Sequence, residues 1–206
     1  NQTVKAKTVI ISTGASARWL GLESEKALTG YGVSSCATCD GAFFKDKVVT
    51  VVGGGDTAME EALFLTRFAS HVHILNRSSN FKASVIMLER ARAHEKITVH
   101  ENVVVEKIND VETKKVTGMT LRETLTNKQY ELACDGVFIA IGHKPNTGLF
   151  DMLDKDDVGY LITDGVKTNV PGVFACGDVQ DSKYRQAITA SGSGCMAALE
   201  AERWIG

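Results

Sequence analysis

The chain has 206 residues, a hydrophobic fraction of 44% and a formal net charge of -2 at pH 7. This length suits one large domain or one and a half smaller ones. A net charge so close to zero argues against a large basic surface for nucleic acid. No apolar run reaches the roughly 18 residues that span a bilayer, so we expect no transmembrane helix.

Cysteine usage suggests the compartment. Of the five cysteines, only Cys36 and Cys39 are close in sequence, while Cys134, Cys176 and Cys195 are scattered. A secreted disulfide scaffold would be shorter and richer in cysteine, and the first residues do not resemble a signal peptide. We therefore expect a cytoplasmic protein in which the close pair is reactive and the other three cysteines are buried.

The first half of the chain predicts a βαβ unit. Thr8–Gly14 has the pattern of a buried strand that ends at a glycine turn, and residues 15–35 are expected to be irregular. Val48–Val52 predicts a fully buried strand because every residue in it is β-branched. Residues 57–69 predict a helix and His71–Leu75 predicts the next strand, which completes the unit.

A second helix is expected over 83–94, and the pattern then changes. Short extended segments indicate a small antiparallel piece that returns to a parallel strand. These segments are Thr98–His100, Val103–Ile108, Val116–Leu125, Gln129–Ala133 and Gly136–Ile141.

The last third predicts further strands and a closing helix. Pro145–Thr147 follows a break in the apolar pattern and predicts a hinge. Tyr160–Thr163 and Val173–Ala175 predict strands. Arg185–Trp204 predicts a helix whose alanines allow close packing.

The glycine motif Gly53-x-Gly55-x-x-Ala58 follows a predicted strand and opens a predicted helix. Glycines there permit a tight turn and let backbone N–H groups approach a pyrophosphate, which the helix N-terminus stabilises. The motif therefore predicts dinucleotide binding. The alternative is a glycine turn that binds nothing.

The residues after the second strand indicate which nicotinamide nucleotide fits. NAD sites place an acid there for the ribose 2′-hydroxyl. The segment 76–82 has no acid and carries two cations, Arg77 and Lys82, that could hold a 2′-phosphate. NADPH is therefore favoured over NADH, unless the two cations simply coat a solvated loop.

Cys36-Ala-Thr-Cys39-Asp40-Gly is a candidate redox motif. One thiol must attack and the other must leave or resolve, and the thiolate is the reactive form. Asp40 is close enough in sequence to supply or take the proton, although it could also be a cap or turn former. A zinc half-site would need two further ligands, which are not evident, and an inert buried pair is the remaining alternative.

Cys176-Gly177-Asp178 follows the predicted strand Val173–Ala175. An aspartate at this position can accept a hydrogen bond from a sugar or ribityl hydroxyl. A plain strand-ending turn is the alternative.

Four motifs together resemble the low-molecular-weight thioredoxin reductases, in the right order and over almost the whole chain. They are Cys36-Ala-Thr-Cys39-Asp-Gly, Gly53-Gly-Gly-Asp-Thr-Ala-Met-Glu-Glu-Ala62, Ala140-Ile-Gly-His-Lys-Pro-Asn146 and Gly177-Asp-Val with Tyr184-Arg-Gln-Ala-Ile-Thr. The resemblance implies an α/β fold of two doubly wound, Rossmann-like nucleotide-binding domains. The FAD domain is split by an inserted NADPH domain.

By this resemblance, residues 1–30 end the first FAD-domain segment, residues 31–143 form the NADPH domain with the CxxC pair, and residues 147–206 form the second FAD-domain segment. The glycine-rich turn that holds the FAD pyrophosphate in the family is not found before the first predicted strand. We therefore expect an N-terminally incomplete chain that binds flavin poorly.

The resemblance implies that electrons pass from NADPH to FAD, then to the Cys36–Cys39 disulfide and then to thioredoxin, in a homodimer. Cys36 corresponds to the thiol that attacks the protein substrate, Cys39 to the thiol next to the flavin, and Asp40 to the acid and base. Phe43 and Phe44 correspond to exposed aromatics that meet thioredoxin. Rotation of one domain against the other would use hinges at Gly30–Gly32 and Gly142–Thr147.

The resemblance also implies a set of cofactor-binding residues, of which Asp178, Arg185, Gln186 and Ala187 correspond to flavin contacts. The last helix would point its positive N-terminal end at the flavin. The full set is Gly53, Gly55, Asp56, Thr57, Arg77, Lys82, Gly142, Gly177, Asp178, Val179, Arg185, Gln186 and Ala187.

The chain departs from the family at the 2′-phosphate site. The family has His-Arg-Arg and a later Arg, whereas this chain has Asn76-Arg77-Ser78 and Lys82. Loss of a guanidinium fork removes bidentate phosphate recognition. We expect a weaker preference for NADPH but no switch to NADH, because no acid replaces the lost cation.

Two other functions are compatible with the same motifs. One is the flavoprotein reductase of a peroxiredoxin or alkyl hydroperoxide system, which normally carries an additional N-terminal thioredoxin-like part. The other is a non-catalytic relative that acts as a sensor, but the presence of both cysteines and Asp40 argues against it.

Overall fold

The computed structural model describes residues 3–206, which divide into two compact units. The first unit contains the residues up to Ser16 together with His143–Gly206, and the second contains Ala17–Gly142. Residues 17–30, which we expected in the first FAD-domain segment, therefore belong to the second unit. Gly30–Gly32, the expected hinge, also lies inside that unit.

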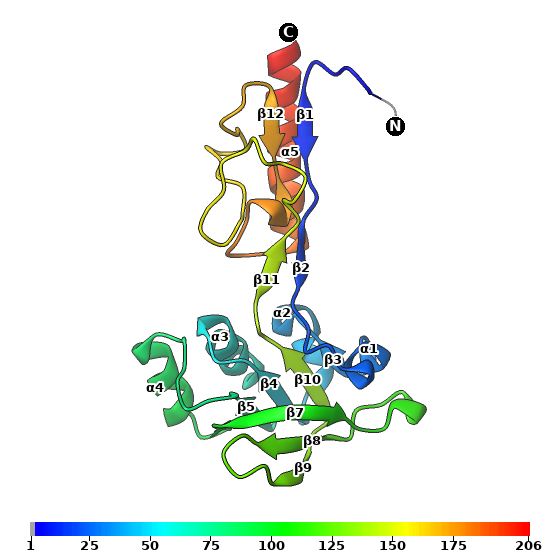
Figure 1. The fold of residues 1–206 in the computed structure, drawn as a ribbon, viewed down its shortest axis with the longest axis vertical. Helices are drawn as coiled ribbons and strands as arrows, with labels where there is room; N and C mark the ends of the chain where they lie inside the picture. The colour runs from blue at the N-terminus through cyan, green and yellow to red at the C-terminus, as the bar shows by residue number, and fades with distance from the viewer. Residues whose placement is uncertain (1–2) are drawn as a thin grey trace. The chain divides into compact units, whose positions relative to one another are not determined.

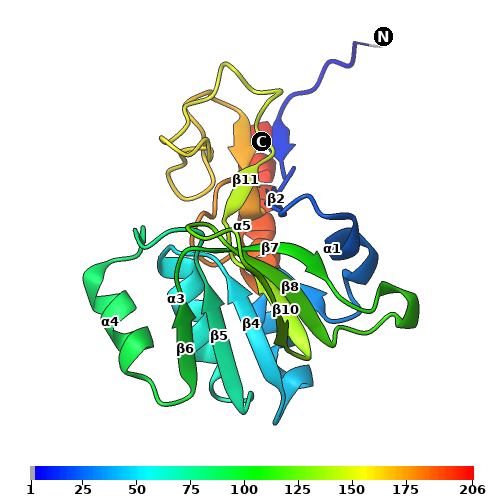
Figure 2. The same cartoon turned by 60° about the horizontal axis from the view of Figure 1, so that its bottom comes forward.

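A five-stranded parallel sheet forms the centre of the second unit, as the sequence of the βαβ region predicts (Figures 1 and 2). Its strand order is β3-β10-β4-β5-β6. The strands are β3 (Val33–Ser34), β10 (Gly136–Ile139), β4 (Val48–Val52), β5 (His71–Leu75) and β6 (Ile97–His100). Because β10 lies between β3 and β4, the chain crosses over within the sheet. Such a strand order is typical of doubly wound nucleotide-binding folds.

Two helices, α3 (Asp56–Leu65) and α4 (Val85–Ala93), cover one face of this sheet. Side chains alternate along a strand, so Val49 and Val51 of β4 point to that face. There they pack with the buried helix residues Met59 and Ala62. The buried apolar area is the main stabilising contribution to this layer.

A three-stranded antiparallel sheet covers the opposite face of the parallel sheet (Figure 1). It contains β7 (Val103–Ile108), β8 (Gly118–Glu123) and β9 (Gln129–Ala133). Met119 and Leu121 of β8 are fully buried in the core that the two sheets share.

The first unit contains β1 (Val9–Ile11), which pairs in parallel with β12 (Val173–Ala175). The long helix α5 (Ala187–Ile205) packs beside this pair. Two further strands, β2 (Ala15–Ala17) and β11 (His143–Pro145), form a separate two-stranded sheet.

Several predicted elements differ from those observed. The segment 15–35, expected to be irregular, contains β2, α1 (Glu23–Leu28) and β3. The strand at 97–100 joins the parallel sheet rather than the antiparallel piece. Tyr160–Thr163 forms no strand, and only an isolated bridge links Leu161 to Lys155. The helix expected over 57–69 ends at Leu65, and the rest of it is a turn.

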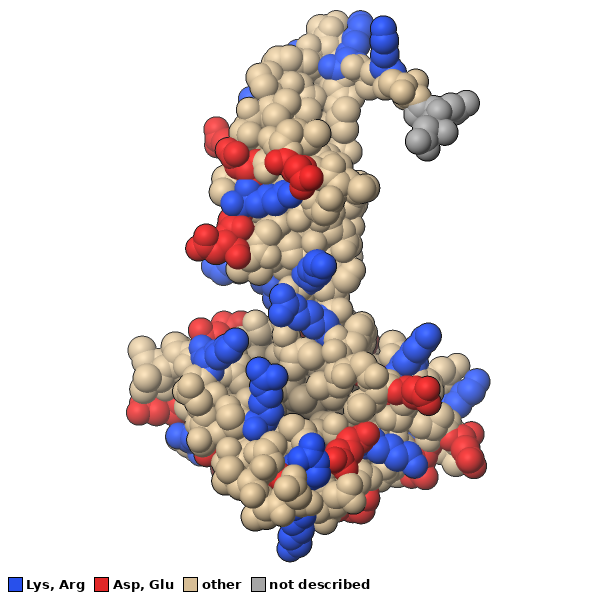
Figure 3. Space-filling view, in the orientation of Figure 1, with Lys and Arg blue, Asp and Glu red and all other residues tan. Residues whose placement is uncertain are grey.

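Cys195 corrects another expectation, because it is exposed on α5, whereas Cys134 and Cys176 are buried as predicted. None of the helices in the described part of the chain is long and apolar enough to cross a membrane. On the face drawn in Figure 3, acidic and basic side chains are interspersed in each unit.

Candidate functional site

The close cysteine pair forms a disulfide at the start of α2 (Ala37–Asp40), directly after β3. The Cα atoms of Cys36 and Cys39 are 5.3 Å apart. Cys36 caps the helix, and its Sγ accepts a hydrogen bond from the N–H of Cys39 at 3.2 Å. Ser34 Oγ in turn accepts the N–H of Cys36 at 3.0 Å. Cys39 is exposed, so this is no inert buried pair.

Asp40 is the last residue of α2 and is half-buried. Its N–H donates to the carbonyl of Cys36 at 3.1 Å, so its backbone belongs to the same helical turn as the two cysteines. Among residues 3–206, no three or more His, Cys, Asp or Glu side chains are placed so that they could hold a metal ion.

The two phenylalanines of the following 3-10 helix, η1 (Gly41–Phe44), have different environments. Phe43 is 82% exposed, as expected for an aromatic that meets a partner. Phe44 corrects the expectation, because its ring packs on that of Phe138 with centroids 5.2 Å apart. It also lies so close to Gly136 that a Cβ there would be 2.2 Å from the ring.

The glycine turn between β4 and α3 is tightly packed at its first glycine and open at its third. A Cβ on Gly53 would lie 2.3 Å from the carbonyl oxygen of Ala140, so this position requires glycine. A Cβ on Gly55 would meet no atom within 4 Å, so the space in front of it is open. The first N–H groups of α3, from Asp56 and Thr57, begin beside this space and can stabilise an anion.

The segment 76–84, which we name the nucleotide loop, follows β5 beside the glycine turn. Asn76 was considered above only as a substitute for a family histidine. In the structure it is buried, and its Nδ2 donates to the carbonyls of Ser78 at 2.8 Å and Asn80 at 3.3 Å. The side chain therefore organises the loop from inside.

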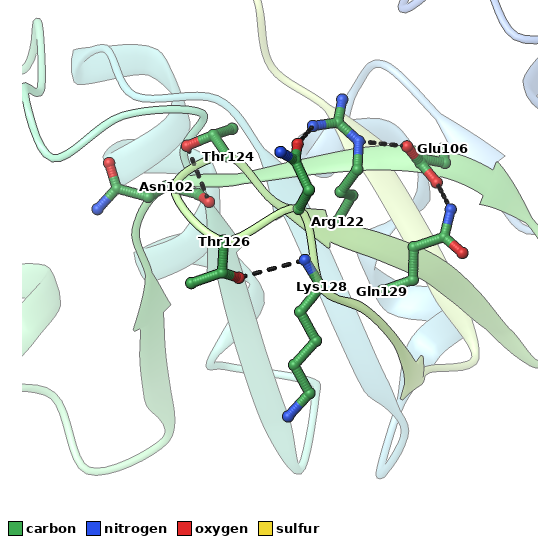
Figure 4. A network of polar contacts seen from close by, with 8 residues as sticks. Asn102, Glu106, Arg122, Thr124, Thr126, Lys128 and Gln129 are labelled. Carbon is green, nitrogen blue, oxygen red and sulfur yellow. Dashed lines mark hydrogen bonds and ion pairs between the residues drawn. The ribbon is translucent and has the colours of Figure 1, made fainter.

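Two cations of the nucleotide loop are available to a ligand. Arg77 and Lys82 are exposed, and neither forms an ion pair with any residue between 3 and 206. Nearby cations are already neutralised, since Arg92 pairs with Glu101 and Arg122 pairs with Glu106. Arg122 donates from Nε to Glu106 at 2.5 Å (Figure 4). Its Nη1 donates to Asn127 at 3.2 Å.

A second candidate site lies wholly within the first unit. A cavity of about 400 Å³ is lined by Asp178, two further residues of the predicted Cys176-Gly177-Asp178 motif and several small residues. The lining residues are Ile10, Ser12, Gly14, Cys176, Gly177, Asp178, Ala190 and Gly194.

Asp178 is the polar group in this cavity that lacks a partner. Its Oδ1 is buried and accepts no hydrogen bond from residues 3–206. Burial raises the pKa of this carboxyl, the charge of Asp181 raises it further, and Arg185 opposes both. A buried acceptor without a donor is costly, so the cavity fits a ligand that supplies a hydroxyl group.

The other residues predicted for this site surround the start of α5. Gln186 caps the helix in a capping box with Thr189, and Ala187 is the first helical residue. Arg185 has a positive φ of 48°, and its N–H donates to Asp181 at 3.1 Å. The side chain of Val179 is fully buried in the core, so only its backbone could meet a ligand.

Gly142, also predicted to bind a cofactor, has a φ of 97° and open space around its Cα. Its carbonyl accepts the N–H of Arg18 at 2.9 Å within the second unit. It follows β10 two residues after Ala140, whose carbonyl oxygen lies against Gly53 of the glycine turn.

Comparison with known proteins decides the family, because the profile of the pyridine nucleotide-disulphide oxidoreductases matches residues 1–194. The chain belongs to this family. The family name implies a flavin and a nicotinamide nucleotide as cofactors.

Within this family, the chain is similar to proteins named thioredoxin reductase. It is 53% identical to that of Mycolicibacterium smegmatis over 208 residues and 55% identical to that of Streptomyces clavuligerus over 204 residues. The two matches cover 100% and 98% of this chain but 66% and 63% of the relatives. The chain therefore spans just under two thirds of their length.

The fold agrees with a solved structure of this group. The crystal structure of thioredoxin reductase from Streptococcus pyogenes superposes with a TM-score of 0.91 at 41% identity. The superposition covers 96% of this chain and 65% of the other.

Sequence reasoning missed two kinds of site residue. The cavity lining includes Ala190 and Gly194, whose only signal was the run of small residues in the predicted last helix. Ser84 was missed entirely, although both its N–H and its hydroxyl donate to Asp56 Oδ1. A contact between residues 28 positions apart leaves no local pattern in the sequence.

Proposed function

We propose that the intact protein is a thioredoxin-disulfide reductase that uses NADPH and FAD. The observation that carries the proposal is the Cys36–Cys39 disulfide, which opens a short helix in the same unit as the glycine turn. Once this disulfide is reduced, a thiolate of the pair can attack a disulfide of another protein.

The chemistry of the cysteines balances as a dithiol–disulfide exchange. NADPH supplies a hydride, which carries two electrons and one proton, and the solvent supplies a second proton. Together they reduce the Cys36–Cys39 bond to two thiols. The Cys36 thiolate then attacks the partner's disulfide and forms a mixed disulfide. Cys39 attacks Cys36 Sγ, restores the original bond and releases the partner as a dithiol. Asp40 holds and returns the proton of the thiol that attacks.

Arg77 and Lys82 support NADPH as the electron donor. Their charges are not neutralised by neighbouring acids in residues 3–206, and a 2′-phosphate would pair with both. A single Arg still offers a bidentate fork, whereas Lys offers a point charge. The preference over NADH is therefore retained but reduced.

The cavity beside α5 supports FAD as the second cofactor. Asp178 would accept a hydroxyl of the ribityl chain, and the N-terminus of α5 would stabilise negative charge. Gly177 has a positive φ of 71°, which turns the chain at the edge of this cavity. When bound, the flavin supplies the two-electron step between the nicotinamide and the disulfide.

Thioredoxin is the proposed partner, and exposed Phe43 is part of the surface that meets it. The names of the relatives do not favour the reductase of a peroxide system. A homodimer and a cytoplasmic location stay predictions.

The test is NADPH-driven reduction of thioredoxin by the intact protein and by its Cys36→Ser variant. We expect the variant to lose activity at least about 1,000-fold, because the attacking thiol is removed. The control is Cys134→Ser, which changes a buried cysteine outside the motif and should retain activity. Unchanged turnover in Cys36→Ser would overturn the proposal.

A further inference from the structure

The nucleotide loop is fixed to the glycine turn by bonds of the protein itself. At its first end, Asn76 lies against Gly54 so closely that a Cβ on Gly54 would be 2.4 Å from Asn76 Oδ1. Near the other end of the loop, the carbonyl of Gly54 accepts the N–H groups of Lys82 at 2.8 Å and Ala83 at 3.0 Å.

The last end of the loop is held by Asp56. Its Oδ1 accepts the N–H of Ser84 at 2.7 Å and the hydroxyl of Ser84 at 2.9 Å. Asp56 is the first residue of α3, and Ser84 is the N-cap of α4. One carboxylate oxygen therefore joins the starts of the two helices.

These bonds set the position of both free cations. Arg77 follows Asn76 directly, and Lys82 precedes Ser84 by two residues. The side chains of Asn76 and Asp56 point to backbone groups of the loop, so neither has to contact a nucleotide to affect binding.

We propose that Asp56, Ser84 and Asn76 form a clasp that presets the nucleotide loop, and that Asp56 is a positioning residue for the 2′-phosphate. The proposal rests on the proposed NADPH site. A loop that is already in its binding conformation loses no affinity to ordering, whereas a loop that opens binds in proportion to its closed fraction. The clasp thus contributes to the discrimination between NADPH and NADH.

Two variants of Asp56 separate positioning from charge. Asp56→Ala removes the acceptor, whereas Asp56→Asn removes the charge but keeps an oxygen that can accept from Ser84. If Asp56 acted only by its charge, both variants would bind an anionic nucleotide more tightly. If it positions the loop, only Asp56→Ala should bind more weakly.

The measurement is the dissociation constant of NADPH and of NADH by calorimetry on the 206-residue chain. We expect Asp56→Ala to bind NADPH about 10-fold more weakly and NADH less than about 3-fold more weakly. Asp56→Asn should bind both nucleotides like the unchanged chain. General destabilisation would weaken both nucleotides equally. Ser84→Ala, which removes one donor and leaves the backbone bond, should weaken NADPH binding about 3-fold and serves if Asp56→Ala does not fold.

The outcomes distinguish the two proposals. Equal NADPH affinity in the unchanged chain and both Ala variants, or an equal loss for NADPH and NADH, would overturn the clasp and leave the reductase function intact. Failure of the unchanged chain to bind either nucleotide would overturn the nucleotide site and the clasp with it. Glu60→Gln, an exposed change of charge on α3, is the matched control and should bind like the unchanged chain.

Discussion

At the residue scale, Gly53 and Gly55 of the glycine turn have different roles. Gly53 is required by packing, because its φ of 156° and the carbonyl of Ala140 leave no room for a Cβ. Gly55 has an ordinary φ of -101° and open space around it, so the fold itself would accept alanine there. The first glycine therefore supports the fold, and the third keeps the approach to the helix N-terminus free.

Alanine at Gly53 should mainly lower stability, whereas alanine at Gly55 should mainly weaken nucleotide binding. Gly53→Ala is expected to lower the free energy of unfolding by about 2–4 kcal/mol, because backbone must shift to accommodate the Cβ. Gly55→Ala should cost less than about 1 kcal/mol but weaken NADPH binding about 10-fold or more. Urea unfolding and calorimetry on both variants check this, and a stability loss as large in Gly55→Ala would contradict it.

The neighbouring phenylalanines offer a second matched pair. Phe44 packs against Phe138 and Gly136, so Phe44→Ala should lower the free energy of unfolding by about 2–4 kcal/mol. Phe43 is exposed, so Phe43→Ala should leave stability within about 0.5 kcal/mol and lower kcat/KM for thioredoxin. Equal stability losses in the two variants would show that the environments have been assigned incorrectly.

At the element scale, the pairing of β5 with β6 brings three histidines together on one face of the parallel sheet. His73 Nδ1 lies 3.0 Å from His100 Nε2, and the rings of His71 and His73 are 4.7 Å apart. Burial, together with the charges of His100 and His71, lowers the pKa of His73 from 6.5 to about 4. Burial likewise lowers the pKa of His100.

This cluster predicts acid sensitivity in a defined range. Above about pH 6.5 His73 is neutral in both the folded and the unfolded chain, so its protonation costs no stability there. Between pH 6.5 and about 4 the unfolded chain binds the proton first, so stability falls as the pH falls. The loss should be about 1–2 kcal/mol, roughly half of the full pKa shift, because the ring is only partly buried.

Unfolding by urea at pH 7.5 and at pH 4.5 measures this loss. His73→Gln should reduce the difference between the two pH values. A difference as large in the variant as in the unchanged chain would contradict the role of His73.

Elements were predictable where the signal was local. The strand Val48–Val52 and the glycine turn were found because β-branched residues and glycines follow one another directly. β6 was assigned to the wrong sheet because its partner, β5, is chosen by tertiary packing. β3 and α1 are only 2 and 6 residues long, too short for a periodic pattern. The hydrogen bonds that Asn76 and Asp56 make to the nucleotide loop were not predicted, because hydrogen-bond donors and acceptors do not recur with a regular spacing in the sequence.

At the scale of the whole molecule, each unit contains its own candidate site. The glycine turn, the nucleotide loop and the disulfide belong to the second unit, and the cavity with Asp178 belongs to the first. Sites that share no residues should bind their ligands independently.

Asp178→Ala tests this independence. Loss of the buried acceptor should weaken flavin binding about 10-fold and leave the dissociation constant of NADPH unchanged. Flavin fluorescence and calorimetry on the same preparation check both values. A parallel loss of NADPH affinity would contradict separate sites.

The most direct test of the account follows the two sulfurs themselves. The intact protein with its flavin is incubated with NADPH, alkylated and analysed by mass spectrometry of the peptide that contains Cys36 and Cys39. We predict two alkylated cysteines with NADPH and an intact disulfide without nucleotide. A disulfide that stays closed in the presence of NADPH would contradict the central claim that this pair receives electrons from the nucleotide.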